Sequence, residues 1–320
     1  MICRRIFLAA LAAATLATCV GVPAALAQDK LTIAFIPGIA SDPFFKAMEV
    51  GARKKAEELG INLIWQGSAS EYSPQSQMPF VDSALANGIN ALILVPTDPD
   101  SLQPAVIKAQ AMNIPVITVD TTVTDQSYLT SHITGDNVDG GRKAAATLAE
   151  QIGDKGEVFI MSGSPTGTTN TLREQGFREE MAKHPDIKIV GKEYALSQPA
   201  TATSAVNTAL LKWPDLAGIF AIDGTSGTGS IAALRNAGKV GKVKLIGYDA
   251  YKVQVDALEE GVFSALVAQR PDEEAELALQ YAYDLLTKTN VDQIKKEVII
   301  PNVVLTKENL AETKKYMYVE

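Results

Sequence analysis

The sequence predicts an α/β protein with two doubly wound, Rossmann-like lobes. From Leu31 onwards, short apolar runs alternate with helical segments. Runs without polar alternation are typical of strands buried on both faces of a parallel sheet. Successive runs begin roughly 20–30 residues apart, the span of a βαβ unit. The runs form two sets, and a chain of 320 residues exceeds the usual size of one core, so we expect two lobes.

The predicted strands are the apolar runs themselves. The first set comprises residues 31–36, 61–65, 91–95 and 116–119, and the second comprises residues 157–161, 187–191, 218–222, 243–247 and 263–268. The first helix is predicted to follow Asp42, which can cap it with Pro43 at the first helical position, and to end at Gly60. A helix beginning at Asn137 is predicted to open the second lobe.

No Ser/Gly/Pro-rich linker separates the two sets of runs. This absence indicates lobes that are joined by short hinge strands, with a cleft between them that can close on a small ligand. The charged tail from Lys307 to Glu320 is interpreted as a terminal helix with a solvated face and no function.

Residues 1–27 are predicted to be a secretory signal peptide. Arg4 and Arg5 precede an apolar stretch over residues 6–22, and Ala25-Leu26-Ala27 matches the small-x-small cleavage pattern. An uncleaved membrane anchor is the first alternative, but the stretch is short for one. Lipid attachment at Cys19 is the second, and Thr18 fits a lipoprotein cleavage box poorly.

Export leaves an acidic chain without thiols. Cys3 and Cys19 both lie in the signal segment, so disulfides, thiolate catalysis and Cys-ligated metals are excluded from the mature chain. Loss of Arg4 and Arg5 moves the formal net charge from −8 to −10. Nucleic acid and anionic membranes need a basic surface, so neither is expected as a partner.

Three apolar runs stop on an aspartate, at Asp120, Asp223 and Asp249. Ligands of open parallel sheets lie beyond the carboxyl ends of the strands, so we expect these carboxylates to face one cleft, Asp120 from the first set and the others from the second. Ionised carboxylates accept hydrogen bonds and cannot donate them. The cleft therefore favours a ligand rich in donors, such as a sugar, a polyol or an amine; for each aspartate alone, a helix cap is the alternative.

The sequence offers little for catalysis. The mature chain retains His132 and His184 as its histidines, and the glycine-rich segment 224–229 lacks the spacing and the lysine of a phosphate-binding loop. No catalytic residue, metal ligand or cofactor is predicted. The enzyme alternative is a metal-dependent phosphotransferase or hydrolase that uses the strand-end carboxylates.

Several segments resemble, in order and spacing, the ribose-binding-protein type of periplasmic sugar receptor. They are DPFF at 42–45, PTD at 96–98, VITVD at 116–120, SHITGDNVDGG at 131–141, Arg173 before Gly176-Phe177, FAID at 220–223, GYD at 247–249 and AQRPD at 268–272. The similarity runs through nearly the whole mature chain. It implies the periplasmic binding protein type I fold, in which two lobes joined by three hinge crossovers close on one sugar. On this resemblance the N-terminal lobe comprises residues 28–134 with 270–299, and the C-terminal lobe comprises residues 135–269 with 300–320.

The resemblance also assigns ligand-binding residues. Phe44 and Phe45 would flank the sugar ring, and Arg173 would donate to its oxygens and partly neutralise the surrounding acids. The residues that would hydrogen-bond hydroxyls are Asp42, Asp120, Asn137, Asp223, Asp249 and Gln269. Asp42 would do so only if its carboxylate is not consumed as a helix cap.

The chain departs from the ribose receptors in ways that bear on the ligand. Thr121 stands where they have a ligand-binding arginine, Gly38 stands where they can have a serine, and Asp42 and Asp223 each replace an asparagine. These changes remove donors and add acceptors. The expected ligand therefore offers more donors than ribose, as a polyol, a cyclitol, another monosaccharide or a hydroxylated amine would.

These observations predict a periplasmic solute-binding protein of an ABC transporter. It would bind a monosaccharide or related polyol, deliver it to a permease in the inner membrane, and act as a monomer without enzyme activity. A receptor of the same fold for an autoinducer or a hydroxylated amine is the alternative within this class.

Overall fold

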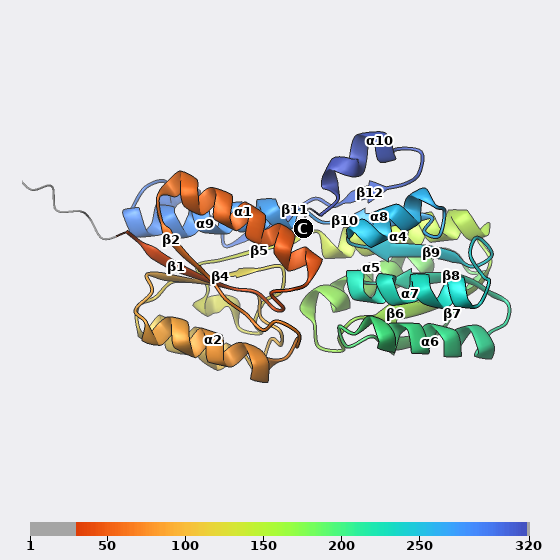
Figure 1. Cartoon of the computed structure of the whole chain (residues 1–320), viewed down its shortest axis with the longest axis horizontal. Helices are drawn as coiled ribbons and strands as arrows, with labels where there is room; N and C mark the ends of the chain where they lie inside the picture. The colour runs from red at the N-terminus through yellow and green to blue at the C-terminus, as the bar shows by residue number, and fades with distance from the viewer. Residues whose placement is uncertain (1–29, 319–320) are drawn as a thin grey trace, which may run out of the picture.

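The computed structural model describes residues 30–318, so the predicted signal peptide with Arg4, Arg5 and both cysteines lies outside the described residues. Within that range two α/β lobes lie end to end, each built on a six-stranded sheet (Figure 1). The predicted fold class is therefore confirmed. No helix between residues 30 and 318 combines the length and apolar character needed to cross a membrane.

The first sheet is parallel throughout and carries helices on both faces. Its strands, in spatial order, are β11 (Glu297–Ile300), β5 (Ser131–Gly135), β4 (Val116–Val119), β3 (Ala91–Leu94), β1 (Thr32–Ile36) and β2 (Asn62–Trp65). Helices α1 (Pro43–Leu59) and α9 (Pro271–Thr287) pack against each other on one face, and α2 (Pro74–Ala86) and α3 (Gln103–Ala111) cover the other. The short helix η1 (Gln126–Tyr128) precedes β5, and η2 (Val291–Gln293) precedes β11.

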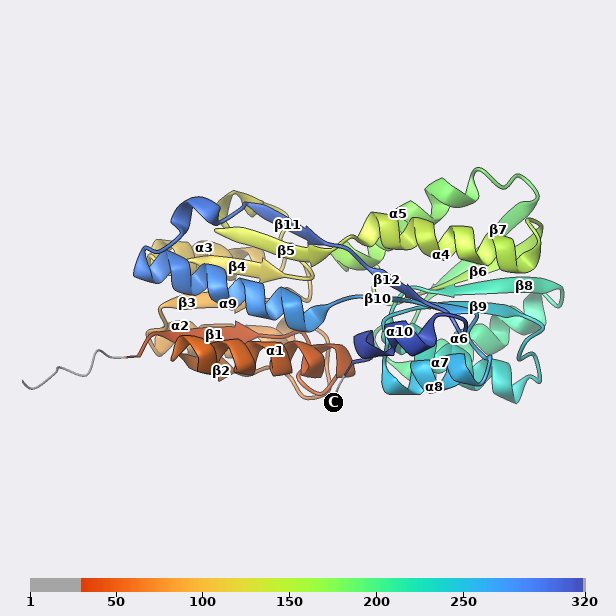
Figure 2. The same ribbon diagram turned by 90° about the horizontal axis from the view of Figure 1, so that it is seen from above.

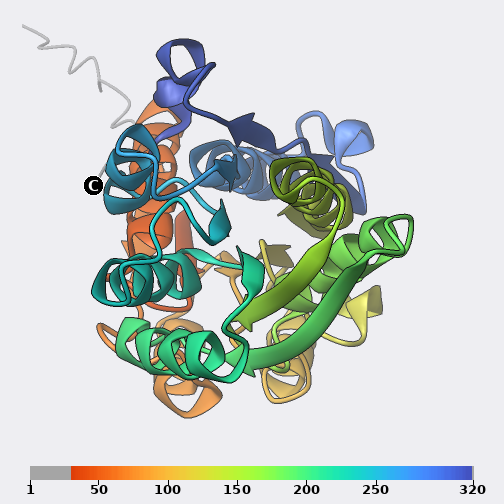
Figure 3. The same cartoon turned by 90° about the vertical axis from the view of Figure 1, so that its right-hand side faces the viewer.

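The second sheet repeats this plan with one antiparallel edge strand, β12. Its strands, in spatial order, are β12 (Val303–Leu305), β10 (Ala265–Ala268), β9 (Lys244–Tyr248), β8 (Leu216–Ala221), β6 (Gly156–Ser162) and β7 (Ile187–Tyr194). Its helices are α4 (Asn137–Ile152) and α5 (Thr168–Met181) on one face, and α6 (Pro199–Lys212), α7 (Gly224–Asn236) and α8 (Lys252–Glu259) on the other (Figure 3). The chain ends in α10 (Leu310–Thr313) and η3 (Lys314–Tyr316).

The sequence-based predictions miss three edge or near-edge strands, β5, β11 and β12. Strand β5 carries the polar residues Ser131, His132 and Thr134, and β11 alternates exposed and more buried residues, so neither forms a continuous apolar run. The glycine-rich segment 224–229 is the first turns of α7 itself and not a loop before it.

The chain passes between the two sheets three times, from β5 into α4, from β10 into α9 and from β11 into β12 (Figure 2). Gly135 and Ile300 pair with each other as the last residues of β5 and β11. Each of these residues therefore lies in the first sheet, one position beyond the boundary that the sequence predicts for the N-terminal lobe.

Helix α1 begins at the predicted residue, and its first residues belong to the site described below. Asp42 is its N-cap, with the Phe44 N–H donating to Asp42 Oδ1 at 2.8 Å, and Pro43 follows at the first helical position. Gly60 ends the helix in the left-handed conformation, with φ of 65°. The cap fixes the backbone at the start of α1, and this positions the side chains of Phe44 and Phe45 at the end of the helix nearest the second lobe.

Candidate ligand-binding site

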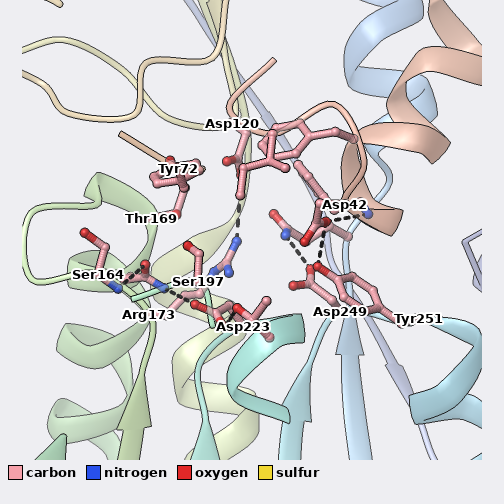
Figure 4. A pocket seen from close by; sticks show the side chains of 16 residues that line it. Asp42, Tyr72, Asp120, Ser164, Thr169, Arg173, Ser197, Asp223, Asp249 and Tyr251 are labelled. Atoms are coloured by element: carbon pink, nitrogen blue, oxygen red, sulfur yellow. Dashed lines mark hydrogen bonds and ion pairs between the residues drawn. The ribbon is translucent and has the colours of Figure 1, made fainter. Parts of the chain in front are cut away.

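A cavity of about 80 Å³ lies where the carboxyl ends of the two sheets face each other (Figure 4). One water needs roughly 10–15 Å³ measured in this way, so the cavity holds several waters or one small molecule. Eight of the nine residues predicted to bind ligand line this cavity. They are Asp42, Phe44, Phe45, Asp120, Arg173, Asp223, Asp249 and Gln269.

Asp120 and Asp249 occupy equivalent places in the two lobes. Each follows the last residue of a buried strand, and each donates its backbone N–H at 2.8 Å to the next strand, to the carbonyls of Ile133 and Val267 respectively. Both have positive φ, 59° for Asp120 and 73° for Asp249. Aspartate and asparagine tolerate this left-handed conformation better than most side chains do. The turn thus favours a short polar residue and directs both carboxylates towards the cleft.

Asp120 has the carboxylate that is least satisfied by the protein. Its Oδ1 is buried and has no hydrogen-bond partner, and the nearest cation, Arg173 Nη2, lies 3.8 Å away, beyond hydrogen-bonding distance. Burial raises the pKa of Asp120 to about 7, and the charge of Arg173 opposes that rise. A ligand that donates a hydrogen bond here would remove the cost of the unpaired acceptor.

Arg173 is the one cation among the cavity-lining residues. Its Nε donates to Asn137 Oδ1 at 2.8 Å, its Nη1 donates to the Ile222 carbonyl at 3.1 Å, and its guanidinium lies 3.9 Å from the centre of the Tyr248 ring. These contacts fix the plane of the guanidinium and leave Nη2 on the side of Asp120. Figure 4 shows this edge of Arg173 facing Asp120 across the cavity.

Asn137 lies behind Arg173 and is absent from the residues that line the cavity. Its Nδ2 donates to Thr134 Oγ1 and to the Gly135 carbonyl, both at 3.0 Å, while its Oδ1 accepts from Arg173. All of its side-chain polar atoms are engaged within the protein. In this structure Asn137 therefore holds Arg173 in place, where the sequence suggested a direct ligand contact.

Asp223 and Asp249 are better satisfied than Asp120. Asp223 caps α7, with Oδ1 accepting from the Ser226 N–H at 2.8 Å and from Thr225 Oγ1 at 2.9 Å. Asp249 accepts from the Gly224 N–H at 2.8 Å and from Gln269 Nε2 at 2.7 Å. Burial raises the pKa of Asp249, with Arg173 opposing the rise. Each carboxylate still has acceptor capacity on the cavity side, since two oxygens offer about four lone-pair sites.

The carboxylate of Asp42 both caps α1 and links the two lobes. Besides the Phe44 N–H, its Oδ1 accepts a hydrogen bond of 2.7 Å from the hydroxyl of Tyr251, which belongs to the second lobe. Burial raises the pKa of Asp42 to about 7. Asp42 Oδ2 is the atom left for a ligand.

Aromatic rings form one wall of the cavity. Phe44 and Phe45 meet edge to face, with ring centres 5.2 Å apart, and both are buried. Tyr72 and Tyr251 add rings that sequence reasoning missed. No sequence pattern identifies Tyr72; in the structure its ring packs so closely on Gly38 that a Cβ there would collide with it.

The other missed lining residues come from loops of the second lobe and from the starts of α5 and α7: Ser164, Thr169, Asn170, Ser197 and Thr225, with Ile39 from the first lobe. Asn170 lies one helical turn before Arg173 on α5, so helical spacing could have identified it. Ser197 has φ of 55° in the loop before α6, a placement that no apolar periodicity encodes.

No group of three or more His, Cys, Asp or Glu side chains between residues 30 and 318 is placed to hold a metal ion. The acids instead alternate with donors, with Arg173 opposite Asp120 and Asn170 within 3.3 Å of Asp223 Oδ2. Such a cavity can bind a neutral ligand that both donates and accepts hydrogen bonds and has an apolar face for the rings.

Comparison with known proteins adds independent information. Residues 33–290 match the family model described as a periplasmic binding protein domain. The chain is 31% identical over 263 residues to the ribose import binding protein of Escherichia coli K12, covering 81% of this chain and 87% of that protein.

Two solved structures are similar in fold and sequence. An ABC transporter solute-binding protein from Agrobacterium vitis, bound with α-D-tagatopyranose, superposes with a TM-score of 0.87 at 34% identity and covers 91% of this chain and 100% of its own. A periplasmic solute-binding protein from Actinobacillus succinogenes 130z, with bound D-allose, gives a TM-score of 0.80 at 30% identity and covers 87% and 98%.

Proposed function

Because this chain belongs to the periplasmic binding protein family, whose members are transport receptors and not enzymes, we propose that it binds one monosaccharide or related polyol between its lobes and delivers it to an ABC permease. The resemblance to ribose-binding proteins that the sequence motifs suggest is confirmed by the family match and by the E. coli relative. The family also argues against the metal-dependent phosphotransferase or hydrolase considered from the sequence.

The observation that carries the proposed ligand site is the pairing of Asp120 and Arg173 across the cavity. Asp120 offers a buried acceptor without a partner, and Arg173 Nη2 is a donor 3.8 Å away. One sugar hydroxyl can donate to the first and accept from the second, since a hydroxyl does both. Phe44 and Phe45 would cover the apolar face of the ring. We therefore assign direct contacts to Asp42, Asp120, Arg173, Asp223, Asp249 and Gln269, and an indirect role to Asn137.

Within the sugars, the site favours a ligand richer in donors than ribose. Thr121, at the position of the second arginine of the ribose receptors, donates its hydroxyl to the Pro96 carbonyl at 2.7 Å and is absent from the cavity lining. Four carboxylates and one guanidinium remain among the lining residues. We propose an aldohexose or a ketohexose, which would match the size of the allose and the tagatose in the two similar structures.

The acidic excess also favours a second candidate, a hydroxylated amine or amino sugar, whose ammonium group would offset the carboxylates. An autoinducer is the third ligand class that the fold accommodates. The binding screen described below includes an amino sugar and so tests the second candidate.

We further propose that residues 1–27 direct export and are removed, leaving a periplasmic monomer without a lipid at Cys19. Family relatives are periplasmic, which supports this location. The mass of the protein recovered from the periplasm would identify the cleavage site, and its sedimentation would give its oligomeric state.

A thermal-shift screen of residues 28–320 tests the proposed ligand class. The panel contains D-tagatose, D-allose, D-ribose, xylitol, myo-inositol and D-galactosamine. We expect at least one neutral sugar or polyol to raise the melting temperature, because ligand that binds the folded state stabilises it by mass action. Stabilisation by the amine alone would move the ligand class to the second candidate, and no shift with any compound would contradict the proposal.

A further inference from the structure

The C-terminal tail, for which the sequence suggested no function, returns to the ligand cavity. Figures 1 and 2 show α10 near the junction of the two lobes, on the side of the second lobe and next to β12. Beyond η3 the chain places Tyr318 in the interior, with 4% of its surface exposed. The Tyr318 N–H donates to the Ala250 carbonyl at 2.9 Å, which ties the tail to the residue that follows Asp249.

The hydroxyl of Tyr318 contacts the carboxylate of Asp249. It donates to Asp249 Oδ1 at 3.1 Å and accepts from the Gln269 N–H at 3.1 Å. Gln269 Nε2 donates to the same Oδ1 at 2.7 Å. Burial, and next the charge of Asp249, raise the pKa of Tyr318 well above its usual value, so the hydroxyl stays protonated and remains a donor.

The ring of Tyr318 supports the aromatic wall from behind. Its centre lies 5.9 Å from the Phe44 ring of the first lobe and 6.0 Å from the Tyr251 ring of the second. Phe44, Tyr251 and Asp249 all line the cavity, whereas Tyr318 is absent from the lining. With Gln269, which donates to its hydroxyl, the Tyr318 side chain thus contacts four cavity residues from two lobes and is itself absent from the cavity lining.

We propose that Tyr318 is a positioning residue for ligand binding, because its hydroxyl fixes the side chain of Asp249 and its ring fixes the packing of Phe44 and Tyr251. This inference rests on the proposed function of the cavity. It makes the C-terminal tail part of the binding apparatus, and it explains why the tail folds back over the junction of the lobes instead of ending at β12.

The variant Tyr318→Phe tests the hydroxyl while keeping the ring. Calorimetric titration with D-tagatose, D-allose and D-ribose should show affinity reduced about fivefold to twentyfold for each sugar that wild type binds, because Asp249 is then no longer held in place. This loss is smaller than the full worth of a hydrogen bond to a charged group, since the Tyr318–Asp249 bond exists before the ligand binds. The matched control is Tyr316→Phe, two residues earlier in the same tail and absent from the cavity lining; its affinity should equal that of wild type.

A double-mutant cycle with Asp249→Asn separates positioning from general stability. If Tyr318 acts through Asp249, the loss caused by Tyr318→Phe should shrink strongly in the Asp249→Asn background. Equal losses in both backgrounds, or an unchanged affinity for Tyr318→Phe, would overturn the inference while leaving the proposed function intact.

A measurement without ligand keeps the two proposals distinguishable. Carboxyl ¹³C NMR titration measures the pKa of Asp249, whose signal is assigned because it is absent from the spectrum of Asp249→Asn. This pKa should be higher in Tyr318→Phe than in wild type by about half a unit or more, since a donor to the charged form has been removed. An unchanged pKa would overturn the positioning role even if no sugar of the panel binds, whereas failure of wild type to bind any panel compound would count against the proposed function alone.

Discussion

At the scale of single residues, the site concentrates four aspartates, of which Asp42 and Asp223 also cap helices while Asp120 lacks a hydrogen-bond partner on one buried oxygen. Asp120 keeps a buried oxygen without a hydrogen-bond partner, and Asp42 holds two donors on one oxygen. An unpaired buried acceptor costs about 1–3 kcal/mol, more when it is charged. The protein retains this cost in the unliganded state, and a ligand with correctly placed donors would recover it.

The pH dependence of stability should reveal this cost. Burial raises the pKa of Asp42 and of Asp120 from 3.8 to about 7. Acids with a raised folded-state pKa stabilise the fold most below their unfolded pKa, and this contribution is lost as the pH rises through the folded value. The unfolding free energy of the ligand-free protein should therefore fall from pH 4 to pH 7 and level off above pH 7.

The variant Asp120→Asn should flatten that fall and make the ligand-free protein more stable than wild type at pH 8. Urea denaturation at pH 5, 6.5 and 8 measures both effects, with Asp215→Asn, an exposed carboxylate, as the control. A variant profile parallel to that of wild type would contradict the assignment of a costly buried charge to Asp120.

Half of the residues that line the cavity could be predicted, and three of them for a purely local reason. Strand-end aspartates follow apolar runs, and both signals are local in the sequence, so Asp120, Asp223 and Asp249 could be placed at the cleft. Asn137 differs, because its hydrogen bond with Arg173 depends on the packing of α5 against α4, which the sequence does not reveal. Ser197 and Tyr251 come from loops whose course depends on tertiary contacts, and the sequence pattern does not encode that course.

At the scale of secondary-structure elements, the close contact between α4 and α5 positions Arg173. A Cβ on Gly141 would collide with the Arg173 carbonyl, and a Cβ on Gly176 would collide with the Val138 carbonyl. The two helices therefore approach through paired glycines. This contact brings Asn137, the first residue of α4, within 2.8 Å of Arg173 Nε.

The variant Gly176→Ala should separate α4 from α5. We expect the free energy of unfolding to fall by about 1–3 kcal/mol, as for other overpacked contacts. Sugar affinity should fall as well, because Arg173 shifts with its helix. Chemical denaturation and calorimetric titration measure the two effects, and Gln175→Ala, at an exposed position of the same helix, is the control. Wild-type stability in Gly176→Ala would contradict the close-contact interpretation.

The strands that the sequence did not predict also belong to this scale. Strand β11 lies at a sheet edge and includes the exposed Glu297, so it is not uniformly apolar, whereas β12 is an apolar edge strand of only three residues. Central strands are buried on both faces and give continuous apolar runs, which is why β1, β3, β4, β6, β8, β9 and β10 could be predicted. The edge strands β2 and β7 could be predicted as well, because each contains an apolar run of its own.

At the scale of the whole molecule, the two lobes meet through few direct side-chain links around the cavity. Tyr251 donates across the cleft to Asp42, Arg173 faces Asp120, and Tyr318 packs on Phe44. The largest apolar core also runs through both lobes and includes Phe44, Tyr251 and Tyr318. These contacts between the lobes can be removed one at a time.

The variant Tyr251→Phe removes the hydroxyl that joins the lobes and keeps the ring. Loss of one hydrogen bond to a carboxylate, worth about 1.5 kcal/mol, should shift the open-to-closed ratio about tenfold. Small-angle X-ray scattering should then give a larger radius of gyration for the ligand-free variant than for wild type. Tyr128→Phe, at an exposed position of the first lobe, should leave the radius unchanged. Identical scattering of Tyr251→Phe and wild type would show that this hydrogen bond does not hold the lobes together.

The central claim is that one small polyhydroxylated molecule binds between the lobes through the strand-end aspartates. Calorimetric titration of wild type and Asp120→Ala with the most stabilising sugar or polyol of the panel tests it most directly. We predict one binding site per chain in wild type, with affinity at least a hundredfold weaker in Asp120→Ala, since the acceptor and the partner of Arg173 are both lost. Equal affinity of the two proteins for that compound would contradict the account.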